Sequence, residues 1–220
     1  MLIATSLAAI VVTISAPADV KSSLVDRVTA EADAIWRSAG LAITWERQPA
    51  RASSRTLHVI FGNERGNATS SLQPLGWIRF DDDRPTLDMY LSYANAVSLL
   101  ETSRDSLGLS HNMTILERDI YLSRALGRAL AHELGHYLLA SKAHTADGLM
   151  KANRTASEFF SADRRRFAVA AREWLQTSRL EDAPPSAGGL PRRVYEATAL
   201  GRRLLEAHAQ LARLLPEFAR

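Results

Sequence analysis

The segment His132-Glu133-Leu134-Gly135-His136 contains two histidines four residues apart, with a glutamate directly after the first. On a helix, residues four apart share a face, so the imidazoles of His132 and His136 can bind one tetrahedral cation together. Glu133 lies beside that face, where its carboxylate can take a proton from a water on the metal. The pattern therefore predicts a hydrolytic metal site with Glu133 as the general base.

A third ligand is needed, because a catalytic zinc site usually has three protein ligands and an open fourth position. His144 is the nearest histidine, and it can reach the metal if the helix ends near Ala140 and the chain then turns back. Three of the six histidines fall between His132 and His144, which favours this choice. Glu158 and Asp147 stay open as alternative third ligands.

The amino-acid composition excludes several kinds of functional site. The 220 residues include no cysteine, so disulfides, thiolate metal sites and cysteine nucleophiles are excluded. The chain has 27 basic and 24 acidic side chains, a formal charge of only +3, and no basic run interleaved with aromatic residues. We therefore expect no nucleic-acid partner.

The segment HELGHYLLASKAHTADGLM resembles the metzincin clan of zinc metallopeptidases, whose pattern is HExxHxxGxxH followed by a turn that contains a methionine. The resemblance implies that zinc (Zn²⁺) is bound by His132, His136 and His144, with Glu133 as the general base. It also implies that Met150 forms an apolar floor under the site. This chain departs from the clan in having Leu139 at the glycine position and two more residues between the second and third histidines.

The elements that must position these residues follow from hydrophobic periodicity. Residues 116–140 carry the broadest apolar stripe and are predicted to form the helix that bears the site. Further helices are expected at 20–39 and from an N-cap at Ser161 to residue 177. Strands are expected at 9–15, 41–46, 56–61, 75–80 and 86–92, with an acidic turn between the last two.

With the resemblance, this order predicts an α+β, zincin-like fold. Its twisted mixed sheet of four to five strands would pack on a backing helix and an active-site helix. The expected domain spans residues 1–180 and is followed by a linker at 181–191 and an amphipathic helix at 192–220. That terminal helix offers a surface for self-association.

The apolar N-terminus has two interpretations. The first fourteen residues are too few to span a bilayer as a helix, so no transmembrane helix is expected there. Ala16-Pro17-Ala18 resembles a signal-peptide cleavage site, yet no basic region precedes it, and a buried first strand is favoured. Localisation depends on this choice: extracytoplasmic if residues 1–18 are a signal remnant, otherwise cytoplasmic.

The expected function is a zinc-dependent peptidase that acts on a protein or peptide, with the substrate extended along an edge strand at residues 75–80. One alternative is a catalytically weak or inactive zincin-like module that binds metal or a partner. A second is a scaffold protein with structural zinc. The presence of Glu133 favours the peptidase, and three histidines without cysteine would be an unusual closed structural site.

Overall fold

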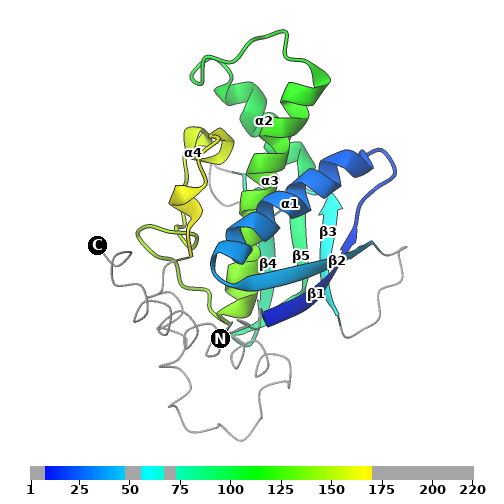
Figure 1. Ribbon diagram of the computed structural model, residues 1–220, viewed down its shortest axis with the longest axis vertical. Helices are drawn as coiled ribbons and strands as arrows, with labels where there is room; N and C mark the ends of the chain where they lie inside the picture. Colours follow the sequence, from blue (N-terminus) through cyan, green and yellow to red (C-terminus); the bar gives the residue numbers. More distant parts are fainter. Residues whose placement is uncertain (1–7, 48–55, 67–72, 170–220) are drawn as a thin grey trace, which may run out of the picture.

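The computed structural model describes residues 8–47, 56–66 and 73–169. Within these ranges five strands form one sheet in the order β2-β1-β3-β5-β4, and helices α1 and α3 pack on it (Figure 1). The strands are β1 (Ala8–Ser15), β2 (Leu41–Arg47), β3 (Leu57–Gly62), β4 (Gly76–Asp81) and β5 (Arg84–Ser92). The sheet is mostly parallel, and this mixed architecture is compatible with the predicted α+β class.

Strand β1 lies inside the sheet and not at its edge. It pairs in parallel with β2 on one side and with β3 on the other. Helix α1 (Ser22–Ser38) makes the crossover from β1 to β2. Val12 and Ile14 are buried on the helix-facing side, as alternation along a strand requires. The predicted strand at residues 9–15 is therefore confirmed.

Strand β4 forms one edge of the sheet and is its only antiparallel member within the described ranges. It pairs with β5 through a two-residue turn, Asp82 and Asp83, whose φ angles of 44° and 64° are both positive. A two-residue hairpin favours this geometry, and aspartate tolerates it better than most residues do. Because β4 pairs only with β5, its other side has no strand partner in the described part of the chain.

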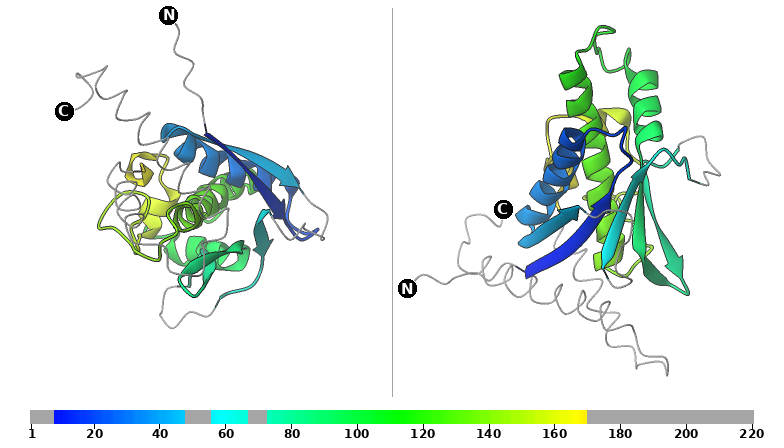
Figure 2. Two further views of the ribbon diagram at one scale, coloured as in Figure 1. Left: turned by 90° about the horizontal axis from the view of Figure 1, so that it is seen from below. Right: turned by 90° about the vertical axis from the view of Figure 1, so that its right-hand side faces the viewer.

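Helix α3 (Ile115–Leu138) runs through the middle of the molecule, as the left view of Figure 2 shows almost along its axis. A capping box starts it: the Thr114 side chain accepts from the Glu117 amide, and Glu117 accepts from the Thr114 amide at 2.7 Å. Most of its residues beyond Ser123 are buried. The site is therefore built on a largely buried part of α3.

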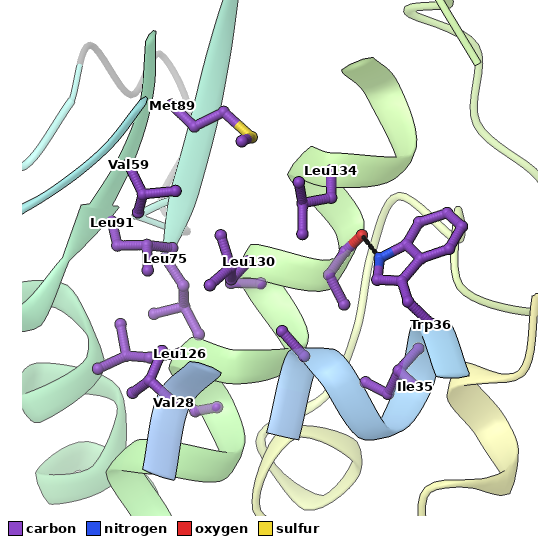
Figure 3. Close-up of a cluster of buried hydrophobic side chains, with 14 of the residues drawn as sticks. Val28, Ile35, Trp36, Val59, Leu75, Met89, Leu91, Leu126, Leu130 and Leu134 are labelled. Carbon is purple, nitrogen blue, oxygen red and sulfur yellow. Dashed lines mark hydrogen bonds between the residues drawn. The ribbon is translucent and has the colours of Figure 1, made fainter. Parts of the chain in front are cut away.

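The core lies between the sheet, α1 and α3 (Figure 3). Leu130 and Leu134 of α3 point towards the sheet, where Val59 and Leu91 meet them. On the other side of α3, the fully buried Trp36 donates its indole N–H to the carbonyl of Ala131 at 3.1 Å. This bond ties α1 to α3 immediately before the first histidine of the motif.

The sequence analysis did not predict two of the helices, α2 (Tyr93–Ser103) and α4 (Ala156–Phe160), which are short and lack a long apolar period. Its predicted helix from Ser161 is wrong over the residues that the structure describes. The helix expected from Ser161 is not formed over 161–169, where Ser161 instead ends α4 and only a 3₁₀ turn, Arg165–Phe167, follows. The Asp163 carbonyl accepts from Arg128 at 3.1 Å, which directs this backbone away from helical bonding.

The rest of that predicted helix, the linker at 181–191 and the terminal helix at 192–220 lie outside the described residues. Among the helices of the described ranges, none combines the length and apolar composition needed to cross a membrane.

Candidate metal centre

His132 and His136 face each other from successive turns of α3. Their Nε2 atoms lie 3.1 Å apart. The Nδ1 atom of His132 lies 2.9 Å from the carbonyl oxygen of Leu149, and that of His136 lies 2.7 Å from the carbonyl oxygen of Ser141. A carbonyl only accepts, so each Nδ1 carries the proton and each Nε2 presents a lone pair.

This arrangement fits a shared cation. Two lone pairs that face each other repel, whereas two imidazoles on a tetrahedral zinc, with Zn–N bonds of 2.0–2.1 Å, place their nitrogens about 3.3 Å apart. The observed separation of 3.1 Å is close to that value. The carbonyl partners hold both rings in the orientation and tautomer that metal binding needs.

His144 is the third member of the group. One nitrogen from each of the three histidines lies within 4.8 Å of the others, and the His144 ring centroid lies 4.9 Å from that of His136. His144 is exposed, whereas His136 is buried. The donor set of three imidazoles without sulfur or carboxylate suits zinc with an open position.

The chain reverses after α3 through a Schellman motif. The amide of Ser141 donates to the carbonyl of His136, and that of Ala140 donates to Tyr137, both at 3.2 Å. The left-handed residue of this motif is Ala140, with φ of 46°. Leu139, which stands at the clan's glycine position, is the helix C-cap with φ of −87°. The turn to His144 is therefore made one residue later and without a glycine.

Glu133 points from α3 to the edge strand. It is buried, and its carboxyl group accepts a hydrogen bond from the backbone N–H of Ile78 in β4. Burial raises the pKa of Glu133 to about 8, while the Ile78 bond acts in the opposite direction. Gly76 allows this approach, since a Cβ atom there would lie 3.2 Å from the Glu133 Cγ atom.

Burial also sets the charge of the imidazoles. It lowers the pKa of His132 to about 3, with the neighbouring His136 as a second cause. It is the main cause of the lowered pKa of His136 and of His144 as well. Neutral imidazole is the form that binds a metal ion, so near neutral pH the group is ready to do so.

Met150 packs against α3 between the two histidines of the helix. A Cβ atom at Gly135 would overlap the Met150 sulfur and would lie 3.2 Å from its methyl carbon. The carbonyl of Met150 accepts from the amide of Thr145 at 3.0 Å, and the neighbouring Leu149 carbonyl holds His132. The loop of residues 145–150, here called the methionine turn, thus supports both ends of the histidine group.

The two acidic alternatives are placed differently. Within the described residues, the three histidines are the one group of His, Asp or Glu side chains close enough to hold a metal ion. Glu158 instead accepts from the Thr155 amide at 2.8 Å and from the Lys151 ammonium at 3.0 Å. Thr155 and Glu158 form the capping box of α4, a pattern that the sequence contains and that sequence analysis missed. Asp147 is not part of the group either.

The histidines and Glu133 open into a cleft of about 470 Å³. One wall is β4, whose Phe80 ring packs edge-on to His136 with centroids 6.3 Å apart. Lys142, from the loop before His144, reaches Asp83 at the hairpin tip at 2.6 Å and lies over the Phe80 ring. Sequence analysis did not identify Ile78, Phe80 or Lys142, because it gives no register between β4 and α3.

The other described histidines lie away from this cleft and received no predicted role. His58 in β3 contacts the Ser15 hydroxyl at 3.0 Å, and the exposed His111 pairs with Asp105.

No protein-family profile matches this chain, and its comparison with curated proteins gives no match. The assignment of the site therefore depends on its geometry and chemistry.

Proposed function

We propose that this protein is a zinc-dependent peptidase with a zincin-like fold, in which His132, His136 and His144 hold the metal ion. One observation carries the proposal: two imidazole lone pairs converge at 3.1 Å, both rings are oriented by carbonyls, and a buried carboxyl group lies on the next residue. Burying polar groups costs free energy unless they are bonded or bind an ion, so a helix that needed only a polar surface would not bury Glu133 and His136. The cleft beside it gives a substrate access to the group.

The proposed chemistry divides between the metal and the chain. Bound zinc would polarise a peptide carbonyl, lower the pKa of a water towards neutrality and, through its charge, lower the pKa of Glu133. Glu133 would accept a proton from that water and later give it to the leaving amine. The Ile78 N–H keeps the carboxyl group aimed between β4 and the histidines.

Among the described residues, the edge of β4 that faces away from β5 has no strand partner, and such an edge suits an extended peptide. Strand β4 lines the cleft through Gly76, Trp77, Ile78 and Phe80. A peptide added to an exposed edge gains main-chain hydrogen bonds and places alternate side chains in pockets. This geometry supports a protein or peptide substrate and the zincin-like order of an edge strand above the active-site helix.

The test combines metal content with cleavage. Purified protein is analysed for bound zinc and incubated with a quenched fluorescent peptide library, beside Glu133→Gln, which keeps the size of the side chain. We expect stoichiometric zinc in both proteins and cleavage only by the wild type. Zinc without any cleavage would instead identify a metal-binding or partner-binding module, and equal cleavage by Glu133→Gln would reject the mechanism.

A further inference from the structure

Most of the charged side chains that line the cleft are basic. Glu133 is the one acidic residue of the lining, and the basic residues are Arg128, Lys142, Lys151 and Arg154. Arg128 is buried and pairs with Glu31, and Lys142 pairs with Asp83. Lys142 is 56% exposed but reaches to the tip of the β4–β5 hairpin, whereas Lys151, which is 34% exposed, lines the cleft from the loop that follows His144.

The position of Lys151 is set by the loop that carries the third histidine. Thr145 and Lys151 form a parallel β-bridge, so Lys151 lies beside the residue that follows His144. The amide of Lys151 also bonds to the carbonyl of Gly148 at 3.4 Å. The next residues, Ala152 and Asn153, are exposed and line the same cleft. The loop that carries His144 thus continues along the wall of the cleft to Lys151 and Asn153.

Glu158 holds the Lys151 ammonium without using all of its donors. Glu158 Oε1 lies 3.0 Å from Lys151 Nζ, and its Oε2 is engaged with Thr155 at the start of α4. An ammonium group has three N–H donors, and this bond takes one. Two further basic side chains, Arg154 and Arg166, lie 3.8 and 3.9 Å from the same Glu158 oxygen. Glu158 is thus shared among basic side chains, and its single bond to Lys151 leaves that ammonium able to bind an anion from the cleft.

We propose that the cleft binds a carboxylate of its peptide substrate at Lys151, with the Asn153 amide beside it, and that the protein therefore selects peptides that place a carboxylate there. The inference depends on the proposed function, since it takes the cleft as the place where a peptide binds. Four apolar residues also line the cleft and would pack against the stem of a bound side chain: Leu75, Leu99, Ala129 and Phe159. The carboxylate can belong to an aspartate or glutamate side chain or to the C-terminus of the peptide, and both sources present the same group to Lys151.

The test measures binding, so that it does not depend on turnover. Zinc-loaded Glu133→Gln protein is titrated with fluorescent peptides in which one glutamate is moved along the sequence, each paired with its glutamine counterpart. Free and amidated C-termini form a second comparison. We expect at least one glutamate or free-acid peptide to bind about tenfold more tightly than its neutral partner, with the difference falling at high salt.

Lys151→Gln in the same protein should reduce that preference to less than about twofold. The matched control is Lys21→Gln, because Lys21 is 57% exposed, pairs with Asp119 and does not line the cleft. It should leave the preference unchanged. Equal binding of all charged and neutral pairs would overturn the inference, as would a preference that survives Lys151→Gln.

Cleavage by the wild-type protein separates this inference from the proposed function. Cleavage without a carboxylate preference would leave the peptidase in place and reject the carboxylate site. A Lys151-dependent preference in binding without any cleavage would retain the carboxylate site and reject the peptidase.

Discussion

The sulfur of Met150 occupies the position that a side chain at Gly135 would need. Gly135 lies on α3 between the two histidines of the motif, and Met150 is buried beneath this turn of the helix with Trp36 nearby. Glycine in a helix interior costs about 1 kcal/mol relative to alanine, so its presence here needs a reason. The contact with Met150 provides it and couples the methionine turn to the spacing of the metal ligands.

This coupling predicts a non-additive pair of substitutions. Gly135→Ala should destabilise the fold by about 1–2 kcal/mol, because overpacking exceeds the gain in helix propensity. Met150→Ala should cost about 2–4 kcal/mol through the cavity it leaves. The double variant should lose clearly less than the sum, since the alanine at 135 then has room. Urea denaturation measures all three, and strict additivity would contradict the contact.

The turn after α3 predicts a stabilising substitution. Ala140 has φ of 46°, a left-handed conformation that costs a residue with a Cβ atom about 1–2 kcal/mol. Ala140→Gly should therefore raise the stability by about 0.5–1 kcal/mol after the added freedom of the unfolded chain is subtracted. Ala39→Gly is the matched control: Ala39 is the C-cap of α1 with φ of −95°, so glycine should bring no gain there. The melting temperatures of the two variants, compared with that of the wild type, test this prediction.

Among the proposed substitutions, removal of the buried charge of Arg128 should lower the free energy of unfolding most. Arg128 is 0% exposed, pairs with Glu31 at 3.1 Å, and donates to the carbonyls of Glu158, Phe159 and Asp163. Arg128→Met should cost about 3–5 kcal/mol, because it leaves Glu31 with one partner fewer and buried carbonyls unpaired. Arg165→Met, at a side chain 91% exposed, should change stability by less than about 0.5 kcal/mol. Similar losses at both positions would contradict the buried network.

The choice of third ligand predicts opposite effects at two residues. His144→Ala should weaken zinc binding by about 100-fold or more, with little change in the stability of the metal-free fold, because His144 is exposed. Glu158→Ala should leave zinc affinity nearly unchanged and cost about 1 kcal/mol, since it removes the capping box of α4. Competition with a chromophoric chelator gives both affinities. A reversal of the two results would make Glu158 the ligand.

Long periodic elements were predictable because their signals are local. The α3 helix and all five strands were expected within a few residues of their bounds, as was the acidic turn that became Asp82-Asp83. Short helices were not, since α4 is only five residues long and is held by its cap and by Arg128. The error at Ser161 has a related cause: its N-cap signal is local, whereas the Asp163 carbonyl accepts a hydrogen bond from Arg128 of α3, which is distant in the sequence.

The site was predictable where its residues share one helix or a short loop. His132, Glu133, His136 and His144 were identified from spacing alone, and the structure brings the three histidines together. Groups supplied by distant segments were missed, such as the Ile78 amide and the Asp83 carboxylate. Their place depends on how β4 lies against α3, which is a result of tertiary packing.

Gly76 provides a test of that packing which separates metal binding from catalysis. A Cβ atom at Gly76 would lie 3.0 Å from the Leu91 side chain and 3.2 Å from the Glu133 Cγ atom, closer than ordinary contact. Under the proposed function, Gly76→Ala should displace the Glu133 carboxyl group and lower kcat by about tenfold or more, because small misplacements of a general base are costly. Zinc affinity should stay within about twofold, since the histidines are held by other segments. Gly62→Ala, in β3 with its nearest heavy atom at 4.0 Å, should change neither quantity. A Gly76→Ala protein with normal kcat would show that Glu133 does not need its place against β4.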